Sequence, residues 1–116
     1  PEYSLNKERI VGKRQRENFK MAVESGAKMV FGTDAGIFPH GKNAKQFKYM
    51  VEWGMKPIEA IQASTINTAE LFGKTNIGEI KETFDADLIG VKGNPLKDIT
   101  LLENVSFIMK EGQVIK

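Results

Sequence analysis

The chain has 116 residues, of which 41% are apolar and 28% charged, so it can bury a core and makes at most one domain's worth of material. Seventeen basic and fifteen acidic side chains leave a net charge of +2, which argues against a nucleic-acid or membrane partner. The chain has no cysteine, which excludes disulfides and thiolate metal sites.

No apolar run approaches the roughly 20 residues that a membrane span needs. No signal peptide is visible, and the chain starts at Pro1, as an internal piece of a longer protein would. The sequence does not fix the compartment, and the cytoplasm is the favoured one.

The first predicted element is a helix over residues 6–25. Asn6 is placed to cap its start and Gly26 to end it in the left-handed conformation. Its apolar residues fall close to one stripe, with charges opposite: Val11, Phe19, Ala22 and Val23.

The next element is a short apolar run within residues 29–36 (MVFGTDAG). Such a run between turn signals predicts a strand buried on both faces, as in parallel sheets. Asp34 then stands at the C-terminal end of this strand, where α/β barrels and doubly wound sheets carry their chemistry.

Asp34 has two interpretations from its position. It could cap the following turn, as Asp side chains often do. It could also bind a metal or accept a proton from a metal-bound water, which Gly32, Thr33 and Gly36 favour because they offer close approach and a hydroxyl. His40, the only histidine, lies in the Gly/Pro-rich loop that follows and is either structural or a substrate contact.

Three short helices are predicted from residue 43 to residue 73. Their expected bounds are 44–53, capped by Asn43 and ended by Gly54; 57–65, opened by Pro57; and 68–72, capped by Thr65 or Asn67 and closed by Gly73.

From residue 74 the pattern changes to short strand-like runs separated by turn signals: 77–80, 86–91, 105–110 and 113–116. The last two predict a hairpin in which Gly112 needs a positive φ. Asp85 and Asp87 would share the wet face of a strand, so we expect no catalytic role for them. We therefore predict two parts, residues 1–73 and residues 74–116.

The motifs of nearly the whole chain resemble metal-dependent amidohydrolases, in particular the prolidase-like (Xaa-Pro dipeptidase) group. They are FGTDAG at 31–36, PHGKN at 39–43, GMKPIEAI at 54–61, ASTINTAELFG at 63–73, IGEI at 77–80, ADLI at 86–89, NPLKDI at 94–99, the run 105–110 and GQV at 112–114. The resemblance implies an α/β fold. It consists of the C-terminal part of a (β/α)₈ barrel, with strand eight, in residues 1–73, and strands of a small β-sandwich in residues 74–116.

In that group the acid matching Asp34 ligates the metal and moves a proton, and His40 lies where a loop shapes the substrate pocket. The implied reaction is hydrolysis of an amide bond in a dipeptide or N-acyl amino acid, with Zn²⁺ as the cofactor of the complete enzyme. Two residues depart from the group: Gln46 stands where Glu is usual, and Thr83 where Gly is common.

A complete barrel takes about 250 residues. The group's His-x-His strand, bridging lysine and later histidines have no counterpart here, and one Asp with one His is too few ligands for catalytic zinc. We therefore predict a fragment that alone is inactive, holds no metal tightly and self-associates through bare apolar faces. Two alternatives stay open: a non-catalytic module that binds a small ligand or partner through the 34–43 loop, and a scaffold or regulator derived from an inactivated hydrolase.

Overall fold

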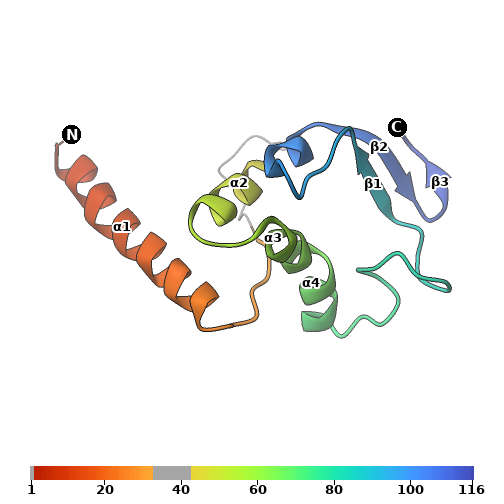
Figure 1. Cartoon of the computed structure of the whole chain (residues 1–116), viewed down its shortest axis with the longest axis horizontal. Helices are drawn as coiled ribbons and strands as arrows, with labels where there is room; N and C mark the ends of the chain where they lie inside the picture. The colour runs from red at the N-terminus through yellow and green to blue at the C-terminus, as the bar shows by residue number, and fades with distance from the viewer. Residues whose placement is uncertain (1, 33–42) are drawn as a thin grey trace.

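The computed structural model of this chain describes residues 2–32 and 43–116. Its elements, in chain order, are α1 (Glu2–Glu24), α2 (Lys45–Glu52), α3 (Pro57–Ser64), α4 (Ile66–Leu71), β1 (Leu88–Val91), the 3₁₀ helix η1 (Ile99–Glu103), β2 (Val105–Lys110) and β3 (Gln113–Val114). Figure 1 shows α1 projecting at one end of the molecule, α2–α4 in the middle and the sheet at the other end. The fold mixes helices with a small sheet. None of the helices described is long and apolar enough to cross a membrane.

Helix α1 begins at Glu2, so the predicted start at residue 6 is wrong and Asn6 lies inside the helix. Residues 2–5 contain no Gly or Pro that would stop the helix, and the acidic residue at its start is stabilised by the helix dipole. The predicted end is confirmed. Gly26 has φ +80°, its N–H donates to Val23 O (3.1 Å) and the next N–H, of Ala27, donates to Ala22 O (3.2 Å). This pair of bonds is a Schellman C-cap.

Two of the helix starts differ from the prediction. Residue 44 is the N-cap of α2 and makes no side-chain cap bond, so Asn43 does not cap this helix. Helix α4 begins at Ile66 rather than at residue 68, and Thr65 is its N-cap residue, as one of the two predicted candidates, but makes no side-chain cap bond. The Thr65 hydroxyl instead donates to Ile61 O (2.9 Å), and Asn67 donates outside its own helix.

The predicted helix ends and the proline start are confirmed. Pro57 is the first residue of α3, where its fixed φ suits the helix and its missing N–H costs nothing. Gly54 and Gly73 follow α2 and α4 with φ +123° and +68°. The boundary that we predicted after residue 73 stays a prediction.

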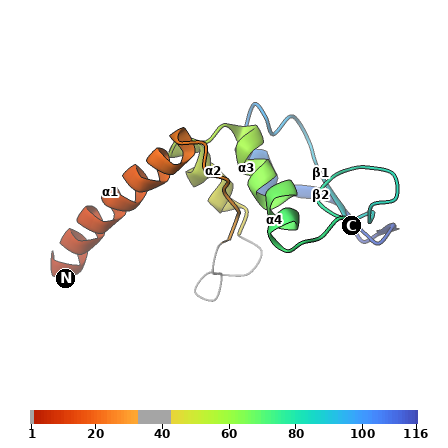
Figure 2. The same ribbon diagram turned by 90° about the horizontal axis from the view of Figure 1, so that it is seen from below.

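The core is small and lies where α2 and α3 meet the end of α1. Met50, Met55, Ala60 and Ala63 are its buried members. Six partly buried apolar side chains pack around them: Phe19, Val23, Met29, Phe31, Phe47 and Val51. The alanines of α3 are fully buried and stand three residues apart, on one face of the helix. Figure 2 shows α3 and α4 following one another beside α2.

The C-terminal sheet is antiparallel, in the order β1-β2-β3. The hairpin between β2 and β3 turns at Glu111 (φ +51°) and Gly112 (φ +80°), which confirms the predicted positive φ at Gly112. Positive φ at both central residues matches the right-handed twist of the strands. The run 77–80 is not a strand, since the chain turns at Gly78 (φ +96°) against α4.

The buried strand that we predicted before Asp34 is not formed over the residues described. Residues 27–32 belong to no helix or strand, and Val30 is 43% exposed. The Phe31 N–H donates to Ala63 O of α3 (3.0 Å) instead of to a strand. A strand needs a neighbour, and the three strands within the described ranges pair with one another.

The molecule is less compact than a complete domain of its length. Its radius of gyration is 16.2 Å, against roughly 13 Å for a compact domain of this size. No large side chain in the part of the chain described is fully buried. The core therefore closes over only a few side chains.

Candidate functional site

Both site residues predicted from the sequence, Asp34 and His40, lie in the stretch 33–42, outside the described residues. The structure does describe what flanks that stretch on either side. On one side is the approach segment, which we define as residues 28–32. On the other side are Asn43 and helix α2.

The approach segment is held by the corner between α3 and α4. The Asn67 side chain donates from Nδ2 to Met29 O (2.8 Å), and the Phe31 N–H donates to Ala63 O (3.0 Å). The Lys28 ammonium forms an ion pair with Glu70 of α4, and both side chains are more than half exposed. The corner between α3 and α4 thus contacts two backbone groups of the approach segment, the Met29 carbonyl and the Phe31 N–H, and one side chain, that of Lys28.

An aromatic stack joins the two flanks. The rings of Phe31 and Phe47 lie with their centroids 4.6 Å apart and their planes 24° from parallel. Phe47 belongs to α2, so the stack holds the end of the approach segment beside the helix that follows the stretch 33–42. Pairs of this kind contribute about 0.5–1.5 kcal/mol beyond the area they bury.

Asn43 borders the undescribed stretch on its other side. Its backbone carbonyl accepts from Gln46 N (3.1 Å). Its side-chain oxygen Oδ1 is buried and finds no hydrogen-bond partner among the residues described.

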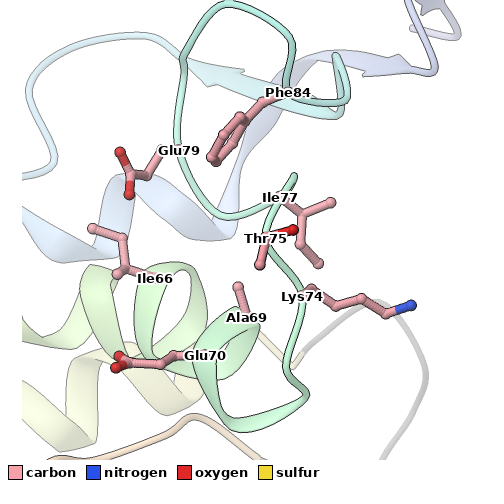
Figure 3. A pocket seen from close by; sticks show the side chains of 8 residues that line it. All are labelled: Ile66, Ala69, Glu70, Lys74, Thr75, Ile77, Glu79 and Phe84. Atoms are coloured by element: carbon pink, nitrogen blue, oxygen red, sulfur yellow. The ribbon is translucent and has the colours of Figure 1, made fainter.

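The sequence interpretation missed a hollow between α4 and the loop over residues 74–84. It has a volume of about 220 Å³ and is lined by Ile66, Ala69, Glu70, Lys74, Thr75, Ile77, Glu79 and Phe84. Figure 3 shows the Phe84 ring and Glu79 on one side of it and Ala69 of α4 on the other. The loop can fold over α4 because Gly78 lacks a Cβ, which would lie 3.0 Å from the Ala69 Cβ. No local sequence pattern predicts this close contact between the loop and α4.

Four of the residues that line the hollow are apolar and four are polar or charged. Glu70, which lines it, already pairs with Lys28. The two acids at the start of β1 have structural partners: Asp85 accepts from Asn76 Nδ2 (3.2 Å) and Asp87 from the Glu111 N–H (2.8 Å). Both are exposed, as expected from the sequence.

The described residues form no metal site of their own. Within residues 2–32 and 43–116, no three His, Asp or Glu side chains gather closely enough to hold one. The chain's predicted ligand is Asp34, which lies outside these ranges.

Comparison with known proteins identifies the family. The sequence pattern of the amidohydrolase family matches residues 4–116 of this chain. A crystal structure of a Xaa-Pro dipeptidase with bound methionine in the active site superposes with a TM-score of 0.89 and 45% identity, over all of this chain and 29% of that one. A prolidase complexed with N-methylphosphonate-L-proline gives a TM-score of 0.84 and 28% identity, over all of this chain and 29% of that one.

Among curated proteins, the ochratoxinase of Aspergillus niger is 33% identical over an alignment of 104 positions, which covers 84% of this chain and 21% of that protein. The chain thus spans between a fifth and a third of the length of these relatives. The match over 113 of the 116 residues confirms the resemblance stated from the motifs. The chain belongs to the amidohydrolase family and resembles its prolidase-like members.

Proposed function

We propose that this chain works as the C-terminal part of a longer hydrolase that cleaves a C–N amide bond in a dipeptide or N-acyl amino acid. The similarity to the Xaa-Pro dipeptidase structure, at 45% identity over the whole chain, carries the proposal. The radius of gyration of 16.2 Å and the small core also support it, because a chain of this length would otherwise close more tightly.

In this proposal Asp34 ligates the metal and moves a proton, and His40 contacts the substrate. The remaining ligands come from outside this chain, since the described residues supply no cluster of their own. Zinc is the first candidate metal, and when bound it would polarise the carbonyl of the scissile amide. The part that the described residues play is to hold the approach segment, and with it the backbone that leads to Asp34.

Exposed apolar side chains support the proposal that further polypeptide covers this one. The most exposed of them include Ile80 (88%), Phe72 (70%) and Leu71 (65%). These residues come from α4, its C-cap and the loop that follows. In the isolated chain we expect them to drive self-association.

The test compares the isolated 116-residue chain with the complete polypeptide that contains it. We expect the isolated chain to elute as oligomers, to carry no stoichiometric zinc and to hydrolyse no dipeptide. We expect the complete polypeptide to carry stoichiometric zinc and to hydrolyse a dipeptide. In the complete polypeptide, Asp34→Asn should lower activity by about 10²–10⁴-fold, because it removes the group that moves a proton.

Asp87→Asn is the matched control, because Asp87 only holds the hairpin turn. It should keep both zinc and activity. Tight zinc and turnover in the isolated chain, or full activity in Asp34→Asn, would overturn the proposal.

A further inference from the structure

We infer that Asn67 is a positioning residue for Asp34, acting through the backbone of the approach segment. The inference rests on the proposed function, since it takes Asp34 to be the reacting acid. From the sequence, Asn67 is a candidate helix cap. In the structure its side chain instead bonds to a segment outside its own helix.

The contact that carries the inference joins residues 38 positions apart. The Asn67 side chain is partly buried, and its Nδ2 donates to the Met29 carbonyl at 2.8 Å. Met29 stands five residues before Asp34. An asparagine in the first turn of a helix ordinarily uses its side chain locally, whereas this one reaches to another segment.

A second bond from the same corner fixes the next backbone group. Ala63 O accepts from the Phe31 N–H (3.0 Å) and also from the Thr68 hydroxyl (2.7 Å). The carbonyl that holds Phe31 is therefore itself held by α4, the helix that carries Asn67. The two bonds hold the approach segment at Met29 and at Phe31, and Phe31 stands three residues before Asp34 in the sequence.

The other contacts cannot replace the Asn67 bond. The Lys28–Glu70 ion pair is exposed and joins flexible side chains, so it fixes the backbone weakly. The Phe31–Phe47 stack fixes a ring rather than the Met29 peptide group. Loss of the Asn67 donor leaves the Met29 carbonyl without this partner and frees the segment to shift. Shifts of about 1 Å at a reacting group can cost about 10²-fold in rate.

The test uses the complete polypeptide, with Asn67→Ala and Asn67→Asp. Asn67→Asp keeps the shape of the side chain and turns an acceptor toward the Met29 carbonyl, so it removes the donor without opening a cavity. We expect both variants to lower kcat by about 10–100-fold, the usual cost of losing an orienting contact. KM should change little, because substrate binding is not the step that depends on this bond.

Hydrogen exchange supplies a readout that is independent of activity. The Phe31 amide should exchange faster in both variants, because the segment loses its second fixed point. Asn94→Ala is the matched control: Asn94 also bonds the backbone through its side chain, accepting from Leu96 N (3.0 Å) in a surface turn. It should leave kcat and the exchange of Phe31 unchanged.

Each result decides between the possibilities. If Asn67→Asp folds and keeps both kcat and the slow exchange of Phe31, the inference is overturned. If kcat falls in the Asn67 variants only as far as in Asn94→Ala, the residue is merely structural and the inference is also overturned. If Asp34→Asn stays fully active while the exchange of Phe31 still rises in the Asn67 variants, the proposed function fails and the backbone role of Asn67 stands.

Discussion

The approach segment and strand β2 are both short apolar stretches, yet they satisfy their backbones in different ways. β2 lies between β1 and β3 and bonds to strands that are near it in the chain. The approach segment takes its bonds from a helix carbonyl and from the side chain of Asn67, more than 30 residues away. The strands of the C-terminal sheet thus form their backbone hydrogen bonds with one another, whereas the approach segment depends on two hydrogen bonds from residues distant in the sequence.

The largest effect should come from the core beneath the approach segment. Met50 is 3% exposed, so Met50→Ala should lower the free energy of unfolding by about 2–5 kcal/mol. Urea unfolding of the complete polypeptide measures this loss. Hydrogen exchange should show the approach segment opening before the sheet.

Met21→Ala is the control for this prediction, since Met21 is 66% exposed. It should change stability by less than about 0.5 kcal/mol. If both regions lost protection equally in Met50→Ala, they would form one cooperative unit and the comparison would be wrong.

A smaller effect is expected where the loop over residues 74–84 meets α4. Gly78 has φ +96°, and an added Cβ would lie 3.0 Å from the Ala69 Cβ and 3.1 Å from Thr65 O. Gly78→Ala should therefore cost about 2–3 kcal/mol, from backbone strain and overlap together. Thermal unfolding would measure it.

Gly73→Ala separates the two causes, because Gly73 has φ +68° but no atom within 4 Å of the added Cβ. It should lose only the strain, about 1–2 kcal/mol. Equal losses in the two variants would show that the close approach to α4 contributes nothing.

The smallest effect is a gain. Thr83 has φ +73°, a conformation that a β-branched residue adopts at a cost. Thr83→Gly should raise the free energy of unfolding by about 0.5–1 kcal/mol, since the relief of strain exceeds the added chain entropy of glycine. Glu82→Gly, at a neighbouring position whose φ is not positive, should give no gain, and a gain there as large as in Thr83→Gly would refute the explanation.

The features that the sequence predicted correctly depend on neighbours in the chain. Gly26, Gly54 and Gly73 end helices because only a left-handed residue fits there, and Gly112 makes its hairpin for the same reason. The departure noted at Thr83 also falls at a position with positive φ, which explains why glycine suits it.

What the sequence could not predict depends on distant contacts. Asn67 looks like a cap because local rules favour Asn at helix starts, and nothing near it in the chain points to Met29. The hollow beside α4 forms only when the loop folds back over Ala69. For the site itself, the family is confirmed, while the roles of Asp34 and His40 stay predictions.

The Phe31–Phe47 stack has a consequence for how this region can diversify. Because Phe31 and Phe47 flank the stretch 33–42, their contact offsets part of the conformational entropy lost on closing that stretch. Doubling the length of a connection adds only about 0.6 kcal/mol of closure entropy when its ends are already fixed. Insertions between the two rings should therefore cost little free energy of unfolding, since the contact between Phe31 and Phe47 that holds the two flanks together lies outside them.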